Sequence, residues 1–147
     1  KIGLTQMQKD IYRKLLKKSM ESESKIAYKN IIMQLRKCCN HPYLFEGVED
    51  YSLPDLDEHL ILNSGKMRVL DKLISRLVSA NSQFLIFSQM TRVLDILEDY
   101  LTYKNLKFCR IDGNTTLEER ENQIADFTKK DSEINCFLLS TRAGGLG

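Results

Sequence analysis

The chain has 147 residues, of which 42% are hydrophobic and 29% are charged, and this composition excludes a disordered or fibrous protein. No apolar run reaches the roughly 18 to 20 residues that a membrane helix needs, and the N-terminus lacks the apolar core of a signal peptide, so we expect a soluble protein that is not secreted. The net charge of +2 is unevenly spread: residues 1–45 carry ten Lys or Arg against three Asp or Glu, residues 46–59 carry none against six, and residues 60–147 carry twelve against eleven. The excess of positive charge in residues 1–45 suits an anionic partner such as nucleic acid, although lysine-rich helices are also common on ordinary protein surfaces.

Two basic amphipathic helices are predicted near the N-terminus. Apolar residues recur at helical spacing over residues 4–15, and Thr5 with Gln8 has the form of a capping box. A second helix with one apolar face is predicted over residues 28–39. It should end before Pro42, because the residue that precedes a proline is pushed out of helical geometry.

Residues 46–59 are acidic, aperiodic and contain Pro54, which predicts a loop between two structural units. The run Asp57-Glu58-His59 is similar to the acidic box of nucleotide hydrolases, but that box has a different spacing and follows a strand, so solvated acidic residues are the preferred interpretation. His41 and His59 are predicted to lie in loops and have no metal-ligand spacing. We assign them neither a catalytic role nor a metal.

The four cysteines form no CxxC pair, which argues against a zinc site and a disulfide framework. Cys109 and Cys136 lie inside apolar runs and are expected to be reduced core residues.

After the acidic loop, predicted helices alternate with short apolar strands, which is typical of an α/β fold with a parallel sheet covered by helices on both faces. Ser64, Thr91 and a Thr116–Glu119 capping box are the expected helix starts. The expected helices cover residues 64–78, 91–105 and 116–130, and the expected strands cover residues 83–87, 107–111 and 134–139.

Each predicted strand is followed by hydroxyls or glycines, and two of the three by an arginine as well. Because parallel strands end at one edge of a sheet, where open α/β sheets bind their ligands, these segments should lie together. We call them the strand-end rim: Ser88–Arg92, Asp112–Thr116 and Ser140–Gly145. Hydroxyls, free backbone N–H groups and guanidinium groups are the donors that hold phosphates. Taken singly, each segment has a plainer explanation as a helix cap or a turn; together they predict a phosphate-binding edge.

The sequence contains no GxxxxGK[ST] loop and no GxGxxG fingerprint. It also has no Ser/His/Asp or Cys/His arrangement that suggests a nucleophile. The residues therefore predict a chain that binds phosphates and performs no chemistry by itself.

Several blocks resemble, in order, the second motor lobe of SWI/SNF-type chromatin-remodelling ATPases, and they are most similar to the ISWI (imitation switch) subfamily. The blocks are "LRKCCNHPYLF" (35–45), "NSGKM" (63–67), "LIFSQMTRVLDILEDYL" (85–101), "RIDGNT" (110–115) and "LLSTRAGGLG" (138–147). Chromodomain-helicase relatives carry similar strings, so the choice between these subfamilies rests on fewer residues.

The resemblance implies a RecA-like, P-loop NTPase-type α/β lobe with an N-terminal helical subdomain, in which "SQMTR" corresponds to helicase motif IV and "STRAGGLG" to motif V. Gly145 and Gly147 would then lie near the nucleotide cleft. Arg120 matches an arginine near the DNA backbone in related helicases, and its alternative is a surface ion pair within its own helix. The resemblance implies that DNA phosphates are contacted by Gln89, Arg92, Gly113, Ser140, Thr141 and Arg142. It also implies a contact by Arg120, unless that residue forms the surface ion pair instead.

By this resemblance, residues 1–45 are a helical segment linked to or inserted in the motor, residues 46–59 an acidic loop, and residues 60–147 a helicase C-terminal lobe that breaks off within motif V. The longer protein would be a nuclear, ATP-dependent DNA translocase acting on nucleosomes, with histones and accessory subunits as partners. ATP and Mg²⁺ would be held mainly by a first lobe, and this chain alone would be inactive. The alternatives are a lobe of another superfamily-2 helicase, a non-catalytic DNA-binding module and a freestanding nucleotide-binding domain.

Overall fold

The computed structural model of the chain describes residues 1–21 and 25–144, and for residues 25–29 and 143–144 it describes the backbone alone. The chain divides into two compact units, Lys1–Lys72 and Leu73–Gly147. In chain order the elements are α1 (Gln6–Met20), α2 (Lys25–Asn40), η1 (Pro42–Leu44), α3 (His59–Leu62), α4 (Gly65–Ser79), β1 (Phe84–Ser88), α5 (Thr91–Tyr103), β2 (Phe108–Ile111), α6 (Leu117–Thr128), β3 (Cys136–Ser140) and α7 (Thr141–Gly144). Within the described residues, no helix is long and apolar enough to cross a membrane.

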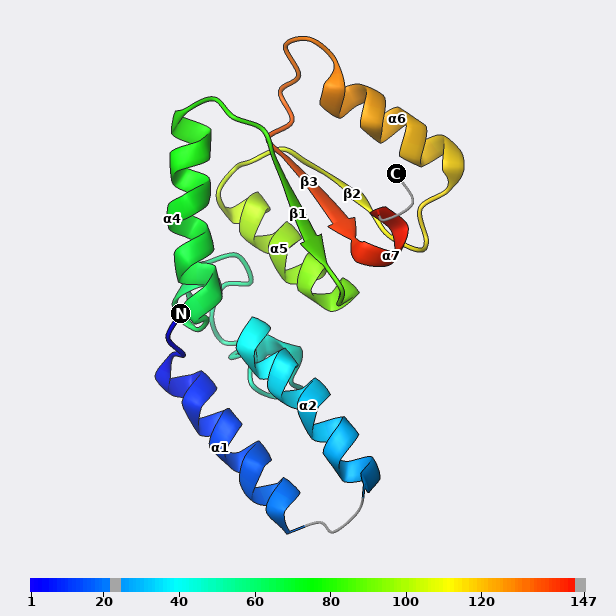
Figure 1. Cartoon of the computed structure of the whole chain (residues 1–147). Coiled ribbons are helices and arrows are strands. Elements are labelled where there is room, and N and C mark those ends of the chain that lie inside the picture. The colour runs from blue at the N-terminus through cyan, green and yellow to red at the C-terminus, as the bar shows by residue number, and fades with distance from the viewer. Residues whose placement is uncertain (22–24, 145–147) are drawn as a thin grey trace. The chain divides into compact units, whose positions relative to one another are not determined.

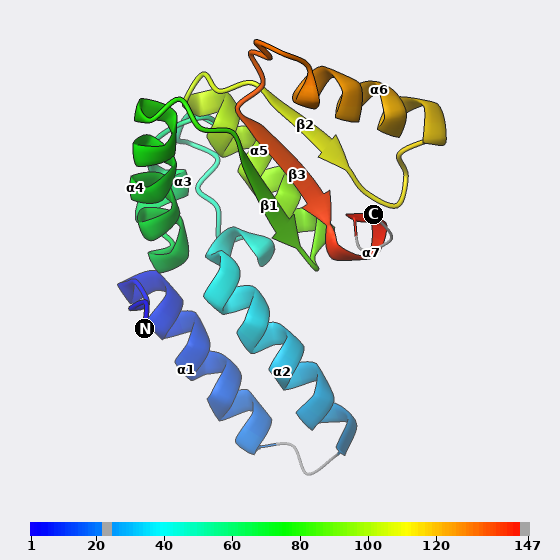
Figure 2. The same cartoon turned by 45° about the horizontal axis from the view of Figure 1, so that its top comes forward.

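The first unit is built on a hairpin of α1 and α2, which lie side by side in both views (Figures 1 and 2). The predicted capping box opens α1: Thr5 Oγ1 accepts from the backbone N–H of Gln8 at 3.3 Å, and Gln8 Oε1 accepts from the backbone N–H of Thr5 at 3.0 Å. The end of α2 at Asn40, just before Pro42, is also as predicted. The apolar face expected for α2 includes Tyr28, whose side chain lies outside the described part.

A buried amide connects distant segments of this unit. The Gln8 side chain is fully buried; its Nε2 donates to the carbonyl of Cys38 at 2.9 Å, and its Oε1 accepts from the backbone N–H of Gly65 at 3.0 Å. Ser64 caps α4 as predicted, since its Oγ accepts from the backbone N–H of Met67. Gln8, the capping-box partner of Thr5, therefore also joins the end of α2 to the start of α4.

The two histidines belong to the same buried polar core. His41 lies between α2 and η1, outside any helix, whereas His59 begins α3, so the prediction of a loop position is wrong for His59. His41 is 1% exposed; its Nε2 donates to the carbonyl of Leu60 at 2.7 Å, and its Nδ1 accepts from the backbone N–H of Tyr43. Burial lowers the pKa of His41 to about 4, so the ring is neutral at physiological pH. His59 is the first residue of α3 and contacts the Tyr43 hydroxyl through Nδ1 at 2.8 Å. The Leu60 carbonyl lies 19 residues from His41 and the Tyr43 hydroxyl 16 residues from His59, so no local pattern reveals that both rings are buried.

The second unit contains a parallel three-stranded sheet in the order β1-β3-β2, and this confirms the predicted α/β fold. Helix α5 packs against β1 and β3, and α6 against β2, on opposite faces of the sheet (Figures 1 and 2). On the α6 face, Phe127 meets Phe137 edge to face at 5.2 Å between ring centroids. Cys109 and Cys136 are buried free thiols, as predicted. Burial raises the pKa of Cys136 to about 12, which keeps this thiol protonated.

Candidate functional site

The three segments of the strand-end rim begin at one level of the sheet. Ser88 and Ser140 are register partners across β1 and β3, and Ile111 of β2 pairs with Leu139 of β3. Asp112 therefore follows at the level of Ser140. Since the strands are parallel, all three segments leave the sheet on the same edge, where the sequence predicted them.

The first segment joins β1 to α5. Ser88 Oγ accepts from the backbone N–H of Met90 at 3.2 Å and donates to its carbonyl at 2.9 Å, so the turn is stabilised before the helix begins. Met90 is the N-cap residue and has no side-chain cap, while Thr91 is already helical. The prediction that Thr91 caps α5 is therefore wrong, because Ser88 orders the turn instead. Gln89 and Arg92 are exposed, and Arg92 makes no hydrogen bond or ion pair with a described residue.

The second segment is a hydrogen-bonded turn. Asp112 Oδ1 accepts from the backbone N–H of Asn114 at 2.9 Å, and the backbone N–H of Asp112 donates to Thr115 Oγ1 at 3.0 Å. Thr116 then opens α6 with the predicted capping box to Glu119. Gly113, between them, is exposed. A Cβ at this position would have nothing within 4 Å, so packing inside the chain does not require a glycine there.

The third segment leaves β3 directly into α7. The Ser140 side chain is buried, at 5% exposure, and has a partner within the chain. Thr141 and Arg142 are exposed, and Arg142, like Arg92, pairs with no described residue. Gly145 and Gly147 lie outside the described residues.

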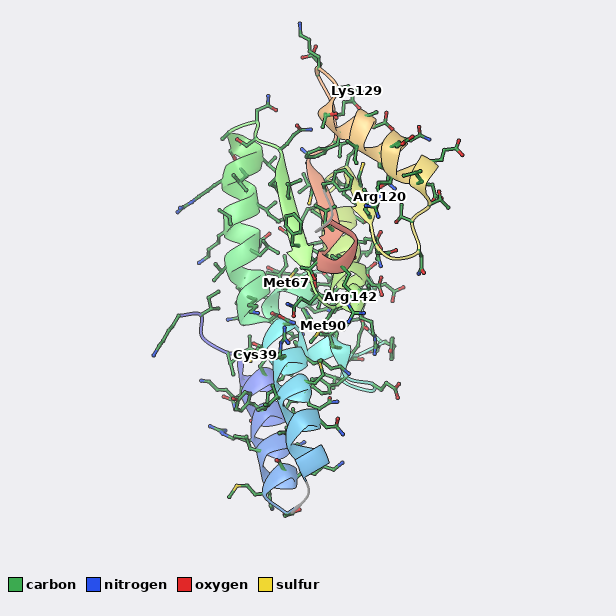
Figure 3. The ribbon with its side chains drawn as sticks, turned by 45° about the vertical axis from the view of Figure 1, so that its right-hand side comes forward. Cys39, Met67, Met90, Arg120, Lys129 and Arg142 are labelled. Atoms are coloured by element: carbon green, nitrogen blue, oxygen red, sulfur yellow. The ribbon has the colours of Figure 1, made fainter. Side chains whose placement is uncertain are left out.

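Arg120 lies on α6, beyond the strand ends themselves, and Figure 3 shows it on that helix with Arg142 on α7. Its side chain is half-buried and takes part in an interaction within the chain. Among the predicted contact residues, the exposed cations of the rim are therefore Arg92 and Arg142.

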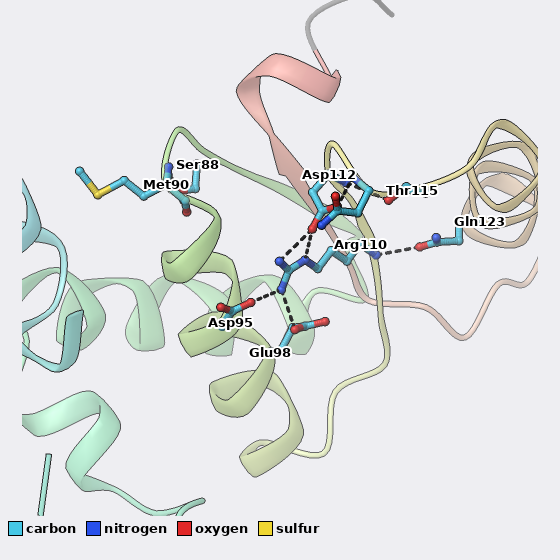
Figure 4. Close-up of polar contacts among 9 residues, drawn as sticks. Ser88, Met90, Asp95, Glu98, Arg110, Asp112, Thr115 and Gln123 are labelled. Carbon is cyan, nitrogen blue, oxygen red and sulfur yellow. Dashed lines mark hydrogen bonds and ion pairs between the residues drawn. The ribbon is translucent and has the colours of Figure 1, made fainter. Parts of the chain in front are cut away.

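The sequence did not predict a cluster of charged residues around Arg110, which includes Asp112 of the strand-end rim and is shown in close-up in Figure 4. Arg110, in β2, contacts three carboxylates: Asp95 at 2.6 Å, Glu98 at 2.7 Å and Asp112 at 2.9 Å. Burial acts to lower the pKa of Arg110, but the hydrogen bonds from Asp95 and Asp112 and the charge of Glu98 outweigh it and raise this pKa above its ordinary value. The available signal was a single arginine inside an apolar strand, since such a residue is almost never buried without partners.

Within residues 1–21 and 25–144, no group of three or more His, Cys, Asp or Glu side chains could hold a metal ion. Burial raises the pKa of Cys38 to about 11, so this thiol, like that of Cys136, is not a nucleophile at neutral pH. What the geometry supplies is a set of cationic and backbone donors on one edge, suited to an anion.

A sequence model of the helicase conserved C-terminal domain matches residues 65–147, more than half of the chain. The chain belongs to this family. Over its full length the chain is 56% identical to the "probable chromatin-remodeling complex ATPase chain" of Oryza sativa subsp. japonica. Over 99% of the chain it is 53% identical to the ISWI chromatin-remodeling complex ATPase ISW2 of Saccharomyces cerevisiae, and 45% identical to the chromodomain-helicase-DNA-binding protein 1-like of Mus musculus.

The predicted resemblance to ISWI ATPases is thus confirmed. The chain spans about 14% of the length of the rice and yeast relatives. Among solved structures, it matches the C-terminal part of the Fun30 ATPase domain with a TM-score of 0.80 at 26% identity, covering 99% of this chain and 69% of that one. It matches the Sulfolobus solfataricus SWI2/SNF2 ATPase C-terminal domain with a TM-score of 0.80 at 18% identity, covering 95% and 60%. These neighbours confirm the predicted RecA-like fold.

Proposed function

We propose that this chain is the second motor lobe of an ATP-dependent DNA translocase that remodels nucleosomes. The observation that carries the proposal is the alignment of three donor segments on one sheet edge. It occurs in a chain that contains a helicase C-terminal domain and is more than half identical to ISWI remodelling ATPases. In this proposal the rim grips the phosphates of one DNA strand.

The exposed groups of the rim match that task. Arg92 and Arg142 offer guanidinium groups that no described residue engages, and Arg92 lies in the first turn of α5, where the helix dipole also favours an anion. Gly113 offers bare backbone in an exposed turn. Gln89 and Thr141 add polar side chains beside them. Gln89, Ser140 and Arg120 each have a partner within the chain. We include them as DNA contacts for which that interaction would change on binding.

The division of the chain is part of the same proposal. Residues 1–45 would be a helical segment attached to the motor, residues 46–59 an acidic connection, and residues 60–147 the lobe, which is supported by the family match over residues 65–147. ATP and Mg²⁺ would be held mainly by another lobe of the whole protein, because this sequence contains no GxxxxGK[ST] loop. Gly145 and Gly147 stay predicted neighbours of the nucleotide.

Phosphate contacts carry no sequence information, so the proposed partner is double-stranded DNA of any sequence. We expect the protein to act in the nucleus, on nucleosomes and their histones. ATP binding would close the two lobes and hydrolysis would open them. The grip on DNA would then alternate between the lobes, and DNA would move past the motor. Accessory subunits belong to the whole protein.

The first experiment measures duplex DNA binding by the 147-residue chain, by fluorescence anisotropy over a series of salt concentrations. Arg92→Ala should weaken binding and reduce the slope of log K against log salt by about 0.9, as expected for one lost phosphate contact. Gly113→Ala should weaken binding without changing stability, because the added Cβ meets nothing within the chain. Arg76→Ala, which removes an exposed arginine of α4, is the matched control. Equal binding by all four proteins would contradict the proposal.

The second experiment concerns ATP hydrolysis. We expect no ATPase activity from this chain alone. A longer protein that includes the preceding lobe and the segment after residue 147 should hydrolyse ATP, faster with nucleosomes. Stimulation of that protein by RNA alone would favour another superfamily-2 helicase.

A second candidate, a non-catalytic DNA-binding module, is favoured by one observation: α1 carries five basic residues against one acidic residue. It predicts that replacing Lys14, Lys17 and Lys18 with alanine removes DNA binding while Arg92→Ala has no effect. The translocase proposal predicts the reverse order of effects.

A further inference from the structure

Arg110 lies one residue before the end of β2 and reaches two other elements. Its Nη1 contacts Asp95 and Glu98 of α5, and its Nε and Nη2 donate to Asp112 Oδ2 at 3.0 and 2.9 Å. Its backbone N–H donates to Gln123 Oε1 of α6 at 2.8 Å. One residue thus joins β2, both flanking helices and the second rim segment (Figure 4).

Asp112 connects Arg110 to the second segment of the strand-end rim. Its Oδ2 is held by the guanidinium of Arg110, and its Oδ1 holds the backbone N–H of Asn114. The Asp112 backbone also bonds Thr115 in both directions, through the Thr115 side chain and the Thr115 N–H. The conformation around Gly113 therefore depends on where Arg110 holds the Asp112 carboxylate.

The charge balance makes Arg110 necessary for this arrangement. Three carboxylates, on Asp95, Glu98 and Asp112, surround one guanidinium. The Arg110 side chain is only 19% exposed and that of Asp112 13%, so water screens their interaction incompletely. Without the cation the carboxylates repel one another, and the Asp112 turn loses its attachment to α5. The carboxylates raise the pKa of Arg110, which as an arginine is already protonated at neutral pH, so the guanidinium stays charged.

We infer that Arg110 is a positioning residue of the strand-end rim, which fixes the Asp112–Thr116 turn against α5 so that Gly113 and Arg92 face a phosphate backbone at a set spacing. Arg92 precedes Asp95 by one helical turn, so the ion pair that holds Asp95 also holds the end of α5 that carries Arg92. The role in DNA binding rests on the function proposed above. In this inference Arg110 contacts no phosphate itself, because its Nε, Nη1 and Nη2 atoms all face carboxylates within the chain.

Arg110→Lys tests the geometry at constant charge. A lysine ammonium is one compact donor centre and cannot reproduce the planar fork that meets three carboxylates at once. Backbone ¹⁵N order parameters of Gly113 and Asn114 should fall from about 0.85 to below about 0.6, the range of a flexible segment, while that of Leu138 in β3 stays unchanged. The dissociation constant for duplex DNA should rise about fivefold. Arg76→Lys, the matched control on α4, should change neither quantity.

Arg110→Ala separates positioning from direct contact, because it should weaken DNA binding without changing the salt slope. A slope reduced by about 0.9 would mean that Arg110 neutralises a phosphate itself, and the inference would fail. It would also fail if Gly113 and Asn114 stayed ordered in Arg110→Lys, or if that variant bound DNA normally while Arg92→Ala did not. If Arg92→Ala also bound normally, the DNA proposal would be wrong, and the order parameters alone would support or overturn the attachment of the turn by Arg110.

Discussion

Gln8→Leu is the sharpest test of how the first unit is held together. Gln8 is fully buried, and its side chain satisfies the carbonyl of Cys38 at 2.9 Å and the N–H of Gly65 at 3.0 Å. Leucine has a similar size but neither donates nor accepts a hydrogen bond. The substitution therefore leaves these two buried backbone groups unpaired, and it also removes the part-buried capping-box bond from the N–H of Thr5, without opening a large cavity.

The expected loss in the free energy of unfolding is worked out from those two buried backbone groups. Each buried group left without a partner costs about 2 kcal/mol, so the pair costs about 4 kcal/mol. Burying the leucine side chain returns about 2 kcal/mol. The net loss in the free energy of unfolding is thus about 2 kcal/mol, which lowers the urea midpoint by about 1 M.

Urea unfolding followed by far-UV circular dichroism measures this loss, and amide hydrogen exchange of Gly65 shows whether it arises at the predicted bond. The control is Gln6→Leu on the same helix, where the amide makes only an exposed hydrogen bond to Asp10. That variant should change stability by less than about 0.5 kcal/mol. If Gln8→Leu were as stable as Gln6→Leu, or if Gly65 kept its protection, the reasoning would be refuted.

Three further predictions concern stability. Because the pKa of His41 is about 4 in the folded chain and about 6.5 when unfolded, the unfolded state binds more protons between these values, and stability should fall by about 2 kcal/mol from pH 7 to pH 5. His41→Asn, which can still accept from the N–H of Tyr43, should not show this loss in urea titrations at the two pH values. Gly65→Ala should destabilise by about 2 kcal/mol in the same assay, because its Cβ would lie 1.9 Å from the Gly3 carbonyl oxygen; unchanged stability would contradict that contact. Asn105 has a φ of 56°, so Asn105→Ala should cost about 1 kcal/mol while Asn105→Gly costs nothing measurable, and thermal melts that ranked the two in the opposite order would exclude the left-handed conformation.

Sequence alone was sufficient where a bond joins near neighbours in the chain. The Thr5 and Thr116 capping boxes were predictable, because their partners lie three residues away in both cases. The parallel sheet was predictable as well, since helices alternate with apolar strands. The prediction for Thr91 failed because a hydroxyl at a helix start has a competitor in Ser88, and the choice between two neighbouring hydroxyls depends on the turn geometry.

For the strand-end rim, the sequence predicted the position of the segments but not the exposure of their side chains. That its three segments share one edge followed from the sequence, because parallel strands must end together. Which of its groups are exposed did not follow: Ser140 is buried while Thr141, Arg142 and Arg92 are exposed. Exposure depends on what the neighbouring elements cover.

The sequence by itself determined the order of the elements, the parallel sheet and the resemblance to remodelling ATPases, because periodicity, capping and contiguous blocks of residues are local properties. Only the tertiary structure decided that Arg110 meets carboxylates of α5, and that Gln8 and the histidines satisfy backbone groups up to 57 residues away. Such pairs leave no spacing to recognise. They form because a buried polar group must find a partner, and the fold determines which partner is near.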